Sequence, residues 1–230
     1  MSKENKTEQR TYDWHRQRLG IITGSQVGKL FVKGRGKDEY FGKTALDYIN
    51  RLIGERLLDP QVVENDIVFA DYIDKEDVTT SAMRWGIDYE DEARYRYELA
   101  TLNKVEAVGS ILAKIEGFAS SPDGLVESED EKGCVEIKCP GIATFVKYLD
   151  VTDNDSLLKT EPMYFYQCQS HMLVLDAQWC DFVVYYPFLA NPIHIVRIVR
   201  DEEVIGQIEE RVGKAIEIIE LKLNNYAKRD

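Results

Sequence analysis

The segments Ser120-Ser121-Pro122-Asp123-Gly124 and Val135-Glu136-Ile137-Lys138-Cys139-Pro140 decide how this chain is interpreted. The acidic stretch between them is typical of a turn, so they are predicted as the two arms of a β-hairpin. Side chains alternate along a strand, which puts Glu136 and Lys138 on one face and their apolar neighbours on the other. Asp123, at the bend that opens the first arm, is expected to lie close to that pair.

These residue types suit the hydrolysis of a phosphodiester. The reaction at neutral pH needs an activated water and relief of charge on the phosphate, and Mg²⁺ supplies both through oxygen ligands. Asp123, Glu136 and the backbone carbonyl of Ile137 would hold the ion without filling its coordination sphere. Lys138 would hold the attacking water and help to deprotonate it, or balance charge in the transition state.

A carboxylate two residues before a lysine is by itself a weak signal. The pattern occurs four times, at Glu4, Asp130, Glu136 and Glu220. Only Glu136 lies in an apolar-flanked segment typical of a strand, behind a Ser-Pro-Asp-Gly turn. On the residues alone, an amphipathic strand with its charges in water and a simple Pro-Asp-Gly β-turn remain the alternative.

Charge is distributed unevenly along the 230 residues. The net charge of −12 is unusual for a protein that contacts phosphates. Residues 1–60 nevertheless carry 12 Lys and Arg against 8 Asp and Glu, a net of +4, so the rest of the chain carries −16. This asymmetry suits a local nucleic-acid face on an acidic body, and a solvated N-terminal arm explains it equally well.

Composition narrows the class of protein. With 44% hydrophobic residues a packed core is expected. No run of about 18 apolar residues predicts a membrane span, and residues 1–10 lack the apolar region of a secretory signal, so a cytoplasmic location is expected. The four cysteines, at 134, 139, 168 and 180, form no Cys-x-x-Cys pair. We expect buried reduced thiols, with an iron–sulfur cluster or zinc site as the alternative.

Periodicity predicts an α/β fold in which helices pack on a central mixed sheet. Residues 1–11 are expected to be flexible and 12–230 to form a single domain. The acidic stretch 61–78 is predicted as a surface loop or crossing segment, after Pro60 ends a helix. Helices are predicted from Thr23 or Ser25 through Phe31 and over 41–58, 80–102, 162–176 and 202–225, and strands over 105–115, 117–121, 125–127, 134–139, 182–188 and 194–200.

Five blocks, in order, resemble one known family. They are Trp14-His15-Arg16-Gln17-Arg18-Leu19-Gly20-Ile21-Ile22-Thr23-Gly24-Ser25, Trp85-Gly86-Ile87-Asp88-Tyr89-Glu90-Asp91-Glu92-Ala93-Arg94, Ser121-Pro122-Asp123-Gly124-Leu125, Val135-Glu136-Ile137-Lys138-Cys139-Pro140 and Tyr164-x-x-Gln167-Cys168-Gln169. This order is similar to the phage lambda exonuclease and YqaJ-type viral recombinase family, over roughly residues 12–176. The resemblance implies the restriction-endonuclease-like core of the PD-(D/E)XK superfamily.

The resemblance assigns roles in catalysis to five positions. Asp123 and Glu136 correspond to the metal ligands, and Lys138 corresponds to the residue that serves the water. Glu90 corresponds to an acidic position beside the metals, and Gln167 to a glutamine near them. For Glu90 the alternative is an ion pair with the arginine one turn later, and for Gln167 it is an exposed helix position.

Three further positions correspond to the residues that grip a terminal 5′-phosphate: Arg18, Ser25 and Ser121. The paired donors of arginine suit this task, while Ser121 could instead cap the Pro-Asp-Gly turn. Trp14 is expected to anchor the core rather than to stack on DNA. The three histidines, at 15, 171 and 194, lack metal-ligand spacing and are expected in solvated or structural roles.

The resemblance implies a 5′→3′ exonuclease on double-stranded DNA ends that leaves 3′ single-stranded tails for recombination. It also implies a ring-shaped homotrimer, a single-strand-annealing protein as partner, and Mg²⁺ or Mn²⁺ as cofactor with two ions per site. The alternatives are another nuclease on the same core, such as an endonuclease or a CRISPR-type end processor, and a non-catalytic DNA-end-binding protein.

Overall fold

The computed structural model describes residues 9–34, 36, 40–76, 80–127 and 131–228. Its larger sheet has the strand order β4-β5-β6-β7, formed by Gly124–Glu127, Lys132–Lys138, Trp179–Tyr185 and Ile193–Val199. β5 pairs antiparallel with β4 and parallel with β6, and β6 pairs antiparallel with β7. The predicted hairpin and mixed sheet are therefore present, with β5 in the interior of the sheet.

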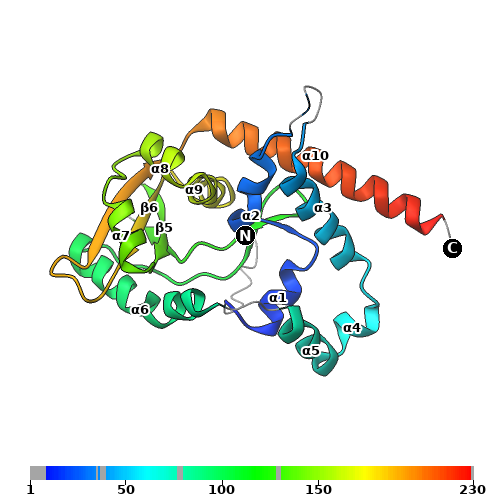
Figure 1. The fold of residues 1–230 in the computed structure, drawn as a ribbon, viewed down its shortest axis with the longest axis horizontal. Coiled ribbons are helices and arrows are strands. Elements are labelled where there is room, and N and C mark those ends of the chain that lie inside the picture. Colours follow the sequence, from blue (N-terminus) through cyan, green and yellow to red (C-terminus); the bar gives the residue numbers. More distant parts are fainter. Residues whose placement is uncertain (1–8, 35, 37–39, 77–79, 128–130, 229–230) are drawn as a thin grey trace.

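Both faces of this sheet are covered. Helix α6 (Ser81–Thr101) packs on one face, where it meets the side chains of Val135 and Ile137. Helix α9 (Pro162–Leu175) packs on the other face, against Cys134 and Phe182. Figure 1 shows α9 between the larger sheet and α2. Because β5 is covered on both faces, its charged side chains at Glu136 and Lys138 lie on the face that α9 covers, beside the apolar side chain of Cys134.

The second layer is built around a small sheet of order β1-β3-β2, formed by Ile22–Thr23, Phe118–Ser120 and Ile111–Leu112. Helices α2 (Gly24–Val27), α3 (Lys43–Arg56) and α10 (Glu202–Ala227) and the 3-10 turn Gly28–Phe31 enclose its core cluster. The apolar stripe predicted on α3 is buried there, at Ala45, Tyr48, Ile49, Leu52 and Ile53.

The remaining helices complete the described part of the chain. α1 (Tyr12–Arg18) carries Trp14 and Arg18, and α7 (Ile142–Tyr148) and α8 (Asn154–Thr160) cover the α9 side of the larger sheet. Among the described residues, no helix combines the length and apolar composition that a membrane span requires. All four cysteines are buried and none forms a disulfide, as expected.

Several predicted boundaries hold closely. Thr80 accepts a hydrogen bond from the backbone of Met83 and begins α6, while Leu102 ends it in a left-handed conformation. Asp201 caps α10 by accepting from two backbone N–H groups of its first turn. The two N-terminal ends follow the usual chemistry of helix caps, and a left-handed residue is a common way for a helix to end.

The prediction for 61–78 is wrong over its described part. Helix α4 runs over Pro60–Glu64 and α5 over Asp66–Glu76. Pro60 does not end a helix but begins one, because its fixed φ and missing N–H suit the first helical position and Asp59 caps the turn. α5 was missed because only Phe69 is buried on it, so its apolar period is weak.

Other elements also differ from prediction. Of the strand expected over 105–115 only Ile111–Leu112 forms, with an isolated bridge between Glu106 and Leu125. Helices α1, α7 and α8 were not predicted. Of the expected flexible N-terminus, residues 1–8 lie outside the described residues, while Gln9 and Arg10 contact the body of the protein.

Candidate active site

The hairpin register places the two predicted carboxylates side by side. The backbone N–H of Asp123 donates to the carbonyl of Val135 at 3.1 Å. Its carboxylate Oδ2 accepts from the backbone N–H of Ile137 at 2.7 Å. Asp123 is thereby fixed beside the strand that carries Glu136 and Lys138, as the alternation of side chains predicts.

Glu136 is buried, with 1% of the residue exposed. Its Oε1 pairs with the ammonium of Lys138, and its Oε2 accepts from Nε2 of His171 at 2.6 Å. Burial alone would raise the pKa of Glu136, but Lys138 and His171 outweigh it and lower that pKa to about 2. The alternative of a strand with its charges in water is therefore wrong.

Burial would by itself lower the pKa of Lys138, yet the charges of Glu136 and Asp123 outweigh it and raise that pKa. The side chain also lies over the ring of Tyr164, with Nζ 4.6 Å from the ring centre. Lys138 is accordingly a charged ammonium in this arrangement. Such a group stabilises negative charge that develops beside it.

Asp123 lacks an equally close cation. Its burial and the charges of Glu136 and Glu90 raise its pKa well above the usual range, against opposing contributions from Lys138 and the N–H of Ile137. Of the three acidic side chains, Asp123 is thus the one without a direct ion pair in the described part of the chain, and a cation bound beside it would favour its charged form.

The donor set fits a hard divalent cation. Among the described residues, no three His, Cys, Asp or Glu side chains are arranged as a metal cluster. Asp123, Glu136 and the carbonyl of Ile137 nevertheless supply oxygen donors around one cavity. A small number of protein oxygens that leaves coordination positions to water is typical of Mg²⁺ sites.

One cavity of about 190 Å³ brings together all nine residues predicted for the site. Gln167 is 6% exposed and faces the cavity, so the exposed-helix alternative is wrong. Glu90 lines the cavity, and it also forms the expected pair with Arg94, at 3.3 Å. The nine residues are Arg18, Ser25, Glu90, Ser121, Asp123, Glu136, Ile137, Lys138 and Gln167.

The residues predicted to grip phosphate form one wall of this cavity. The Arg18 guanidinium donates to Ser121 Oγ at 2.7 Å and stacks on Trp14, with 4.0 Å between its central carbon and the ring centre. Ser25 follows Gly24, where a Cβ would lie 2.1 Å from Ser120 Oγ, so only glycine lets α2 approach this closely. The hydroxyls of Ser25 and Ser121 therefore both face the cavity that Arg18 enters.

Arg18 is a partly buried cation whose described partners are a hydroxyl and an aromatic ring. Burial lowers its pKa to about 10, and among the described residues it forms no ion pair with a carboxylate. An arginine held without a counter-charge favours an anion. Trp14, expected in the core, instead belongs to none of the three core clusters and lines this wall.

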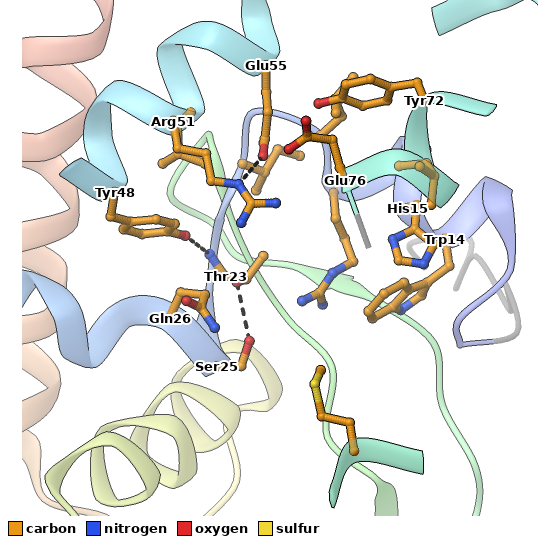
Figure 2. A pocket seen from close by; sticks show the side chains of 16 residues that line it. Trp14, His15, Thr23, Ser25, Gln26, Tyr48, Arg51, Glu55, Tyr72 and Glu76 are labelled. Carbon is orange, nitrogen blue, oxygen red and sulfur yellow. Dashed lines mark hydrogen bonds and ion pairs between the residues drawn. The ribbon is translucent and has the colours of Figure 1, made fainter. Parts of the chain in front are cut away.

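A second cavity, of about 350 Å³, adjoins the first and shares Trp14, Arg18 and Ser25 with it. Figure 2 shows Tyr48 and Arg51 on the wall opposite Trp14. Arg51 is paired with Glu55 at 2.8 Å, in contrast to Arg18. Arg51 therefore already has a carboxylate partner, whereas Arg18 has a hydroxyl partner, Ser121.

Sequence reasoning missed His171. It is fully buried, and its Nδ1 lies 2.7 Å from Ser120 Oγ while its Nε2 contacts Glu136. It lies one helical turn after Gln167, so the period of α9 places both on the same face. That spacing was the signal that could have found it. A solvated role for His171 is wrong, and a structural one is compatible with these contacts.

The sequence of this chain matches one known protein family. A family model described as YqaJ-like viral recombinase domain matches residues 13–178. The chain belongs to this family. A comparison with curated proteins finds no match.

Solved structures agree with the YqaJ-like assignment. An alkaline exonuclease, LHK-Exo from Laribacter hongkongensis, is 32% identical, covers 95% of this chain and 97% of its own, and has a TM-score of 0.74. It has also been solved in complex with dAMP. A phage-related exonuclease from Haemophilus somnus 129PT, 14% identical over 90% and 96% of the two chains with a TM-score of 0.62, supports the fold alone. The predicted fold class, a mixed α/β restriction-endonuclease-like core, is confirmed.

Replacing His171 by leucine is expected to lower the rate of DNA hydrolysis by about 10- to 100-fold, the usual effect of losing a partner that orients a metal-binding group. Glu136 would lose the bond to its Oε2 and with it a fixed orientation. His171→Gln keeps a donor and should recover part of the rate. Rates measured across a Mg²⁺ titration test this, with His194→Gln as control because His194 bonds to the carbonyl of Val151 instead. Equal rates for all three variants would contradict it.

Proposed function

We propose that this YqaJ-like protein is a divalent-metal-dependent 5′→3′ exonuclease that acts on linear double-stranded DNA and leaves 3′ single-stranded tails. Its family and the 32% identical alkaline exonuclease support a nuclease of the exonuclease type. The observation that carries this proposal is the single cavity in which three acidic groups and Lys138 lie beside Arg18, a partly buried arginine that forms no ion pair within the described part of the chain.

The chain's own residues divide the work. Asp123, Glu136 and the carbonyl of Ile137 would hold Mg²⁺ or Mn²⁺. Glu90 and Gln167 line the same cavity, and the proposal includes a second ion there. The bound cations would supply an activated water and neutralise charge on the scissile phosphate.

Lys138 would stabilise the negative charge that develops on the phosphate as the P–O bond breaks. Its ammonium is held in place by Glu136 on one side and by the ring of Tyr164 on the other. Because the side chain is only 24% exposed, its charge is screened less by water than it would be on an open surface.

Arg18, Ser25 and Ser121 would bind the terminal 5′-phosphate. A terminal phosphate carries more charge and more acceptor oxygens than a bridging one, so a partly buried arginine with two hydroxyls would select for it. This supports attack at a 5′ end rather than within the chain. The dAMP complex of LHK-Exo supports mononucleotides as products here.

The proposal also covers the oligomeric state and the protein partner. We propose a homotrimer that encloses duplex DNA and a single-strand-annealing protein as partner, as the family resemblance implies. The net charge of −12 is compatible with a ring whose basic residues face inward. Sedimentation of the purified protein tests the trimer, and a monomeric mass in the presence of DNA would exclude it.

The test of the activity uses linear duplex labelled at one end or the other. With Mg²⁺, the 5′-labelled strand should release labelled mononucleotide at once, and the 3′-labelled strand should shorten progressively. EDTA should stop both. Cleavage of covalently closed circular duplex would show an endonuclease on the same core. If no product formed with or without Mg²⁺, the protein would be a DNA-end-binding protein.

A further inference from the structure

A segment outside the predicted site crosses the active-site cavity. The side-chain amide of Gln9 donates to the carbonyl of Val108 at 3.1 Å and to that of Pro122 at 3.0 Å. Pro122 directly precedes the metal-binding candidate Asp123, and Gln9 and Arg10 both line the cavity. The segment is therefore fixed to the turn that carries a catalytic carboxylate, and Arg10 is delivered to the site at a defined place.

The backbone of Arg10 is strained. Its φ is +68°, in the left-handed region that residues with a Cβ rarely adopt. Glycine would occupy this position without the steric cost. An arginine here raises the energy of the folded backbone, so its benefit must come from the side chain.

The Arg10 guanidinium contacts Glu90, with 2.5 Å between its NH2 nitrogen and Oε2. Glu90 has a second cation, because Arg94 approaches its other oxygen at 3.3 Å. Arg10 lines the cavity and Arg94 does not. The Arg10 side chain is also the more exposed of the two, at 44% against 23%. Glu90 thus keeps a counter-charge when Arg10 leaves it.

We propose that Arg10 binds a phosphate of the DNA strand being cut, exchanging the Glu90 carboxylate for phosphate oxygens when the strand enters the cavity. This inference rests on the proposed function. Arginine presents paired N–H donors that match phosphate geometry, and Arg10 lines the same cavity as the carboxylate that it contacts. Arg94 holds the charge of Glu90 in the meantime, so the exchange leaves no carboxylate unpaired.

A contact with phosphate is recognised by its dependence on salt. The affinity for a 5′-phosphorylated linear duplex is measured between about 50 and 200 mM KCl, with Ca²⁺ in place of Mg²⁺ to prevent hydrolysis. Each lost phosphate contact lowers the slope of log K against log salt by about 0.7 to 0.9. Arg10→Gly should show this change, and kcat/KM with Mg²⁺ should fall about 10-fold or more, as for the loss of one charged hydrogen bond.

Two measurements separate this role from a structural one. Arg96→Gln removes an arginine of the same helix that pairs with Glu92 and does not line the cavity, so it should leave the salt slope unchanged. Arg10→Gly relieves the left-handed strain, so its midpoint of thermal unfolding should be equal to or above that of the unsubstituted protein. An arginine kept only for its ion pair with Glu90 would instead lower that midpoint.

The outcomes are distinct. An unchanged salt slope in Arg10→Gly, or an equal change in Arg96→Gln, would overturn the inference while leaving the nuclease proposal intact. A rise in turnover for Arg10→Gly would also overturn it, since Arg10 would then be blocking the site. Failure of the unsubstituted protein to bind and hydrolyse DNA would remove the proposed function and this inference together.

Discussion

Replacing Lys138 by alanine is expected to abolish DNA hydrolysis, with a fall in kcat of about 10³-fold or more, while divalent metal still binds. The ammonium pairs directly with Glu136 and lines the cavity. Because the side chain is partly buried, its charge stabilises a neighbouring negative charge more strongly than a fully exposed lysine would. Since the oxygen donors stay, Mn²⁺ affinity measured by calorimetry should be unchanged or tighter, because a positive charge next to the ion is gone.

The matched control for that variant is Lys132→Ala. Lys132 opens the same strand, β5, but is exposed and lies outside the cavity. It should hydrolyse DNA at the unsubstituted rate, and circular dichroism should confirm that both variants fold. Hydrolysis by Lys138→Ala above a few per cent of the unsubstituted rate would refute the role of the ammonium.

The candidate site could be predicted from sequence because strand geometry is local. Because side chains alternate along a strand with a period of two residues, Glu136 and Lys138 lie on the same face of β5. The turn at Pro122-Asp123-Gly124 places Asp123 beside them. The alternation of side chains does not show whether that face of β5 is exposed to solvent. The burial of Glu136 depends on α9, which is distant in sequence and packs on the sheet only in the folded chain.

The parts that prediction missed share a physical cause. α4 and α5 bury little, so their apolar period is too weak to detect, although Asp59-Pro60 is a readable helix start. His171 and Arg10 become important only through partners 35 and 80 residues away. A pairing across such a distance leaves no local period or cap, and only the three-dimensional arrangement reveals it.

Replacing Arg18 by alanine is expected to remove the preference for 5′-phosphorylated over 5′-hydroxyl ends. The guanidinium donates to Ser121 and stacks on Trp14, and it enters the cavity without an acidic partner among the described residues. Its loss removes charge-assisted bonds that only a phosphorylated end would form in full, so the rate on phosphorylated duplex should fall by about 100-fold. The rate on hydroxyl ends should change little.

Arg51→Gln is the control for charge alone. It removes an arginine from the neighbouring cavity, but that arginine is already paired with Glu55. If any positive charge near the site were sufficient, both variants would lose the preference equally. If Arg18 reads the phosphate, Arg51→Gln keeps the preference and Arg18→Lys recovers only part of it, since a lysine ammonium cannot form the paired contacts of a guanidinium. A preserved preference in Arg18→Ala would refute the phosphate grip and leave the choice of DNA end to residues beyond this wall.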